Sequence, residues 1–98
     1  MKCGGILNAV RIAQVADAAG IKCMLGSMTE SSLALTASAH VIASQKNVIY
    51  ADLDSFLFNV SNPIIGGMEI KQGVVHLPTA PGLGLDIDPA FLKKLTPA

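Results

Sequence analysis

Apolar residues recur at intervals of three and four near the start of the chain, as they do along one face of an α-helix. Gly20 follows this pattern and is a residue type that commonly ends a helix. The apolar run at 21–25 then predicts a short strand that stops before Gly26. The predicted helical face consists of Ile6, Ala9, Val10, Ala13, Ala16 and Ala19.

A second helix and a second strand follow in the same order. Small residues dominate positions 32–44, which predicts a helix that can approach a sheet closely. Thr29 or Ser31 can cap this helix, and Glu30 suits its positive N-terminal end. The run at 47–51 predicts the next strand. Helices and strands that alternate with short connections are typical of a parallel sheet, so the expected fold class is α/β.

The second half of the chain has a different pattern. Two alternating segments at 68–71 and 74–77 flank a Gln-Gly pair at 72–73 and predict a β-hairpin. Near the C-terminal end, Asp88 and Pro89 predict the cap and the first residue of a short helix. The chain is therefore expected to finish with a hairpin and a tail outside the parallel unit.

The composition indicates that much of this surface is covered by something larger. Of the 98 residues, 51% are hydrophobic and only 14% are charged, whereas a free-standing domain of this size exposes a large polar surface. A parallel unit of two or three strands also cannot close a barrel or cover both faces of its sheet. We therefore expect part of a barrel, with open edges that favour self-association or pairing with the missing barrel portion.

Charge and hydropathy exclude several classes of partner. The formal net charge is zero at pH 7, with seven basic and seven acidic residues, so no nucleic-acid partner is expected. No apolar stretch is long enough to cross a membrane, and the N-terminus lacks the pattern of a signal peptide. A cytoplasmic location is expected by default. Cys3 and Cys23 have no metal-binding or redox spacing and are expected to be reduced thiols.

Two segments that follow predicted strands are candidates for a catalytic or binding site. Functional groups of parallel α/β folds gather at the carboxyl ends of strands, which here are 26–30 and 52–54. If 52–54 is extended, Asp52 and Asp54 project to the same side and can bind a metal ion or an ammonium group. On spacing alone, a solvated loop with turns and caps remains the alternative. The serines of 26–32 lack a GxSxG elbow, so a hydrolase triad is not indicated.

Four segments, in this order and spacing, carry a further signal: Lys2-Cys3-Gly4-Gly5-Ile6, Cys23-Met24-Leu25-Gly26-Ser27-Met28-Thr29-Glu30-Ser31, Ala51-Asp52-Leu53-Asp54 and Pro81-Gly82-Leu83-Gly84. Together they resemble the muconate-lactonising branch of the enolase superfamily, and most closely its dipeptide epimerases of the L-Ala-D/L-Glu type. The first two segments are shared across that branch, and the Asp-x-Asp is more specific to dipeptide epimerases. The resemblance covers nearly the whole chain.

The resemblance implies the C-terminal part of an enolase-type (β/α) TIM barrel. The chain would contribute the seventh and eighth strands with their helices over residues 1–60. Residues 61–98 would form a hairpin and a tail that pack toward a missing N-terminal capping domain. The family exchanges the α-proton of a small dipeptide between two lysines, while Mg²⁺ held by three carboxylates stabilises the enediolate.

Most of that machinery is expected to lie outside this chain. The metal carboxylates belong to the third, fourth and fifth strands, and the second lysine aligns three residues before Lys2. No catalytic residue and no Mg²⁺ site are therefore expected in the chain itself, and it is expected to be inactive alone. Asp52 and Asp54 match the pair that binds the substrate α-ammonium. Gly26, Ser27 and Met28 would line the same pocket.

Two alternatives remain open. The chain could belong to another enzyme of the branch, such as a muconate cycloisomerase or an o-succinylbenzoate synthase, although those substrates carry no α-ammonium. It could also be a non-catalytic binding or assembly module, which the missing metal ligands and lysines favour.

Overall fold

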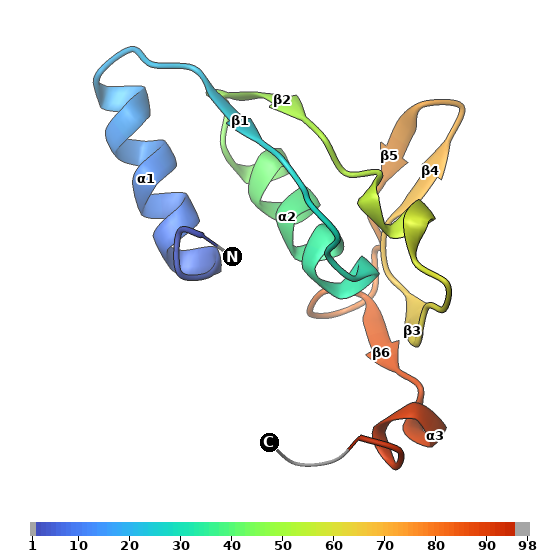
Figure 1. Cartoon of the computed structure of the whole chain (residues 1–98). Coiled ribbons are helices and arrows are strands. Elements are labelled where there is room, and N and C mark those ends of the chain that lie inside the picture. Colours follow the sequence, from blue (N-terminus) through green and yellow to red (C-terminus); the bar gives the residue numbers. More distant parts are fainter. Residues whose placement is uncertain (1, 96–98) are drawn as a thin grey trace.

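The computed structural model describes residues 2–95, which form three helices, one 3₁₀ turn and six short strands (Figure 1). The chain begins with α1 (Ile6–Ala18), and Gly20 at φ 70° ends this helix. The N–H of Gly20 donates to Asp17 O at 2.9 Å, and the N–H of Ile21 donates to Ala16 O at 2.8 Å. This pair of bonds satisfies carbonyls that the end of the helix would otherwise leave free. The predicted first helix and its glycine stop are confirmed.

The parallel unit consists of β1 (Cys23–Leu25) and β2 (Val48–Ala51), joined by α2 (Ser32–Ser44). Both strands and the second helix are confirmed. Figure 1 shows α1 and α2 side by side, and residues of the two helices are in contact. The predicted cap of α2 is wrong, because Ser31 occupies the cap position without a side-chain hydrogen bond.

A buried asparagine connects α1 to this sheet. Asn47 is 2% exposed and precedes β2 directly. Its Nδ2 donates to Ala13 O at 2.8 Å and to Ile21 O at 3.3 Å. Because a buried side-chain amide without partners is costly, these bonds favour one fixed position of α1 relative to the strands.

The hydrophobic core lies between α2 and the second half of the chain. Its buried members are Leu35, Ala39, Leu53 and Met68. The small residues of α2 allow this close approach. A polar contact reinforces the packing, because the N–H of Met68 donates to Oγ1 of the fully buried Thr36 at 3.0 Å.

The second half forms two antiparallel pairs. The predicted hairpin is present as β4 (Glu69–Lys71) and β5 (Val74–His76). Gln72 and Gly73 have φ of 52° and 80°, which suits a two-residue hairpin turn. The sequence did not predict the second pair, in which β3 (Ile64–Gly66) lies antiparallel to β6 (Leu85–Ile87).

A short helix follows β6. This helix, α3 (Pro89–Leu92), is capped as predicted, because Asp88 Oδ1 accepts from Ala90 N at 2.8 Å. The predicted tail extends to residue 98, and residues 96–98 lie outside the described part.

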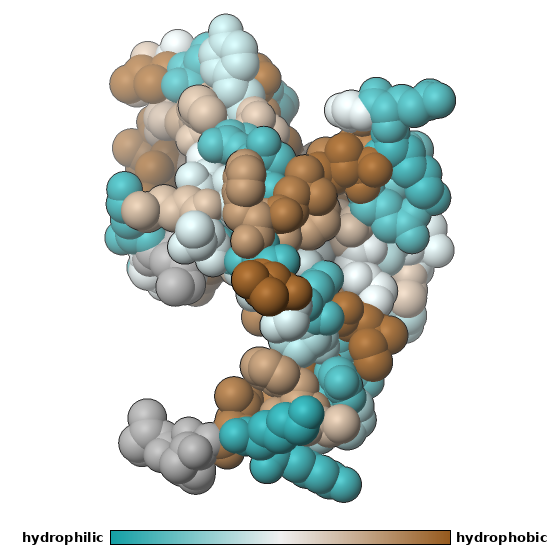
Figure 2. Space-filling model, turned by 45° about the vertical axis from the view of Figure 1, so that its right-hand side comes forward, coloured by the Kyte–Doolittle hydropathy of each residue, from teal (hydrophilic) through white to brown (hydrophobic). Residues whose placement is uncertain are grey.

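Many large apolar side chains are exposed to solvent. Within residues 2–95, β1 and β2 pair only with each other. The paired side chains Met24 and Tyr50 are each 62% exposed. Apolar side chains also lie in several patches on the surface that Figure 2 displays. No helix among the described residues is long and apolar enough to cross a membrane.

Candidate functional site

Asp52 lies directly after β2, beside the end of β1. Its backbone N–H donates to Leu25 O at 3.0 Å, which continues the parallel pairing one residue beyond the strand. Its Oδ1 accepts from Ser27 Oγ at 3.3 Å. The carboxyl ends of two neighbouring parallel strands therefore bring together two of the predicted site residues, Ser27 and Asp52.

Asp54 lies beyond the strand, where the chain turns. Leu53 points into the core and is 6% exposed, whereas Asp54 is exposed. Asp54 has φ −98° and ψ −5°, so it is helical rather than extended, and it precedes the 3₁₀ turn η1 (Ser55–Phe58). The Asp-x-Asp segment is thus not a continuation of β2. The backbone turn at Asp54, rather than strand alternation, determines where its carboxylate lies.

The loop after β1 contains the remaining predicted residues. A side chain at Gly26 would meet no other atom within 4 Å, so Gly26 faces open space. Met28 is 68% exposed. Its backbone N–H donates to Glu30 Oε2, and this hydrogen bond lowers the pKa of Glu30 below the usual 4.5. The carboxylate of Glu30 therefore stabilises its own loop, whereas the sequence predicted a role at the start of α2.

A residue that sequence reasoning missed connects the loop after β1 (residues 26–30) to the segment after β2 (residues 52–59). Asn59 follows η1, and its Nδ2 donates to Glu30 O at 3.3 Å. No motif identifies such a residue, because its partner is a backbone carbonyl, which is present whatever residue type occupies position 30.

Among charged side chains, the segments that contain β1, β2 and the loops after them carry only negative ones. Segments 23–30 and 47–62 contain three carboxylates and no Lys, Arg or His. Glu30 also experiences the charge of Asp52, which opposes the lowering of its pKa. A group of carboxylates attracts a positively charged ligand. An ammonium group can in addition donate charge-assisted hydrogen bonds to carboxylate oxygens.

The described residues do not fit a divalent metal. Among residues 2–95, no three or more His, Cys, Asp or Glu side chains are placed so that they could hold a metal ion. Mg²⁺ is normally bound through carboxylates in near-ideal octahedral geometry. No step that involves a metal is therefore assigned to these residues.

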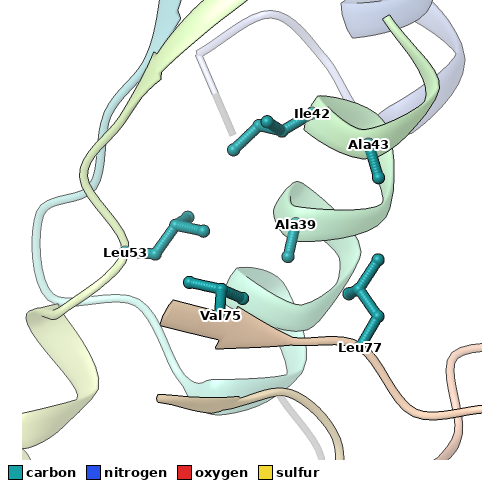
Figure 3. Close-up of a pocket in the computed structure, with 6 residues that line it drawn as sticks. All are labelled: Ala39, Ile42, Ala43, Leu53, Val75 and Leu77. Carbon is teal, nitrogen blue, oxygen red and sulfur yellow. The ribbon is translucent and has the colours of Figure 1, made fainter. Parts of the chain in front are cut away.

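A separate hollow lies between α2 and β5 (Figure 3). Sites for small polar molecules contain a few polar groups that orient the ligand. All side chains that line this hollow are apolar, so it does not fit a dipeptide and we interpret it as a gap in core packing. The lining residues are Ala39, Ile42, Ala43, Leu53, Val75 and Leu77.

Comparison with known proteins identifies relatives that match most of the chain. It is 42% identical over 87 residues to the hydrophobic dipeptide epimerase of Enterococcus faecalis, which covers 87% of this chain and 25% of that protein. It is 41% identical over 93 residues to the L-Ala-D/L-Glu epimerase of Bacillus subtilis, which covers 95% of this chain and 25% of that protein. The chain thus spans about a quarter of the length of these relatives.

A solved structure agrees with these matches. The dipeptide epimerase from Cytophaga hutchinsonii, complexed with Mg and the dipeptide D-Ala-L-Val, superposes with a TM-score of 0.87 at 34% identity. The alignment covers 94% of this chain and 25% of that one. The resemblance to dipeptide epimerases and the expected enolase-type α/β fold are confirmed.

The model of the enolase C-terminal domain-like family matches residues 1–91, which is most of the chain. The chain belongs to the enolase C-terminal domain-like family.

Proposed function

We propose that this chain supplies the substrate-recognition part of a dipeptide epimerase, and that Asp52 and Asp54 bind the α-ammonium of a small dipeptide. The observation that carries the proposal is the placement of two carboxylates just beyond β2, in loops without cations. In the complete enzyme, the remaining barrel would supply the lysines and the Mg²⁺ site. In this proposal the chain itself contributes neither the catalytic lysines nor the Mg²⁺ site.

Electrostatics explains why such a site needs carboxylates. When a substrate enters a closed barrel, its ammonium group loses hydration, which is costly unless charged acceptors replace the water. Asp52 is held by Leu25 O and by the Ser27 hydroxyl, so part of its orientation is fixed before substrate arrives. Pre-organised acceptors reduce the entropy lost on binding. A fixed ammonium in turn helps to place the α-carbon of the adjacent residue for proton exchange.

The same proposal divides the chain into two parts. Residues 1–60 would complete the barrel, with the free edges of β1 and β2 pairing with the strands that are missing here. Residues 61–98 would pack toward the capping domain, although residues 96–98 are outside the described part. A largely apolar hollow supports this second surface. It lies between residues 29–33, which span the end of the loop and the start of α2, and the tail, where Phe91, Leu92 and Leu95 contribute to its wall.

A chimera tests the proposal. The full chain replaces the matching quarter of the Bacillus subtilis L-Ala-D/L-Glu epimerase, and circular dichroism checks that the product folds. With Mg²⁺ in D₂O, proton NMR is expected to show loss of the α-proton signal of L-Ala-L-Glu or of a hydrophobic L,L-dipeptide. A parallel assay follows cis,cis-muconate by its ultraviolet absorbance.

The results of the two assays distinguish the proposed function from its alternatives. Exchange of a dipeptide α-proton without turnover of muconate supports the proposal. Turnover of muconate without exchange supports the cycloisomerase alternative. A folded chimera that does neither, and a full chain whose NMR spectrum is unchanged by millimolar dipeptide, would leave only the assembly role.

A further inference from the structure

We infer that Asn59 is a positioning residue, which fixes the second ammonium-binding carboxylate by tying η1 to the loop after β1. This inference rests on the proposed function. It concerns how Asp54 is held, because the backbone turn at Asp54, rather than the strand, determines where its carboxylate lies.

The geometry places Asp54 and Asn59 at opposite ends of one short element. The N–H of Leu57 donates to Asp54 O at 2.9 Å, and the N–H of Asn59 donates to Phe56 O at 3.2 Å. These bonds make 54–59 a compact turn. Its first end is anchored because Ser55 is only 2% exposed.

The second end of the turn has little packing to hold it. Leu57 and Phe58 are 67% and 76% exposed, and Val60 is fully exposed. The Nδ2 of Asn59 donates to Glu30 O at 3.3 Å, which attaches this end to the 26–30 loop. The side chain of Asp54 does not cap η1, so it is free to meet a ligand while the turn sets its position.

The two loops are consequently joined at three points. Asp52 N bonds to Leu25 O at 3.0 Å, Ser27 Oγ bonds to Asp52 Oδ1 at 3.3 Å, and Asn59 provides the third connection. The first two connections hold Asp52, and the third holds the far end of the turn that begins at Asp54. Buried Ser55 fixes the backbone next to Asp54, and the Asn59 bond fixes the orientation of the turn relative to the 26–30 loop. Loss of the amide of Asn59 should therefore loosen the turn, and Asp54 with it, while both connections of Asp52 remain.

The test compares Asn59→Ala, Asn59→Gln and the matched control Asn62→Ala in the chimera described above. Asn62 is exposed, and its Oδ1 accepts from Ile64 N within its own turn.

The readouts are KM and kcat for a dipeptide with a free amine and for the same dipeptide with its amine acetylated. Asn59→Ala is expected to raise KM about five-fold for the free amine only, with kcat changed less than two-fold. Asn59→Gln, which keeps the amide donor, should recover most of the loss, and Asn62→Ala should behave like the parent.

Two results would overturn the inference. One is an unchanged KM in Asn59→Ala, and the other is an equal loss for both substrates, which indicates a general structural effect. Asp54→Asn is measured in parallel to separate this inference from the proposed function. If Asp54→Asn raises KM while Asn59→Ala does not, only the positioning role fails. If neither variant changes KM, the proposed role of Asp54 fails as well.

Discussion

The hydroxyl of Ser27 donates a hydrogen bond to the carboxylate of Asp52 across the ends of two parallel strands, with an Oγ–Oδ1 distance of 3.3 Å. A hydroxyl that bonds to one carboxylate oxygen restricts rotation of the carboxylate and leaves its other lone pairs for a ligand. Ser27 and Asp52 thus form a small unit in which one residue orients the other.

Removal of the hydroxyl should weaken substrate binding. In the chimera, Ser27→Ala is expected to raise KM for a free-amine dipeptide by at least about ten-fold, since hydrogen bonds to charged groups contribute about 1.5–3 kcal/mol. Ser27→Thr keeps the hydroxyl and should retain most of the affinity. Equal KM values for the alanine and threonine variants would contradict the orienting role.

The loop that contains Ser27 should be sensitive to acid. The N–H of Met28 donates to Glu30 and lowers the pKa of Glu30 below 4.5. Because the folded pKa is depressed, this contact is present at neutral pH and is lost as the pH falls through the folded pKa. NMR titration of the Met28 amide should therefore show a midpoint below pH 4.5, and Glu30→Gln should abolish that transition. A midpoint at or above 4.5 would be inconsistent with the hydrogen bond.

Thr36 should stabilise the docking of the second half of the chain onto α2. Its Oγ1 accepts from the buried N–H of Met68 at 3.0 Å. Thr36→Val keeps the shape but leaves that N–H unpaired, and should lower the free energy of unfolding by about 1–3 kcal/mol. The exposed Thr79 provides a control, because Thr79→Val should change stability by less than about 0.5 kcal/mol. Urea denaturation followed by circular dichroism measures both, and similar values for the two variants would argue against this role.

Asn47 should be one of the most sensitive polar positions in the chain. Asn47→Ala leaves the carbonyls of Ala13 and Ile21 without their side-chain donor and opens a cavity. The expected loss is about 2–3 kcal/mol of unfolding free energy. Gln14→Ala, on the exposed face of α1, should have little effect. An Asn47 variant as stable as the Gln14 variant would show that the buried amide contributes nothing.

The sequence predicts elements whose determinants are local. Periodic alanines specify α1, Gln72 and Gly73 specify the hairpin turn, and Asp88 caps α3. The β3–β6 pair was not predictable, because each strand has three residues and no alternating pattern. Its formation depends on contacts between distant parts of the chain, which local propensity does not encode.

The candidate site was also predictable only in part. The ends of neighbouring parallel strands meet, so the proximity of Ser27 and Asp52 follows from fold class. The helical backbone of Asp54 and the connection from Asn59 to Glu30 O depend on a 3₁₀ turn that has no sequence signature. Buried Asn47 escaped notice for a similar reason, since its partners are backbone carbonyls.

The most direct test of the central claim is the preference of the chimera for a free amine. The measurement is the ratio of kcat/KM for a dipeptide to that for its N-acetyl derivative, in the parent and in a variant with both Asp52→Asn and Asp54→Asn. The asparagines preserve shape but remove the charge that an ammonium group needs. We expect this ratio to fall at least 100-fold in the double variant. An unchanged ratio would show that these two carboxylates do not bind the substrate ammonium.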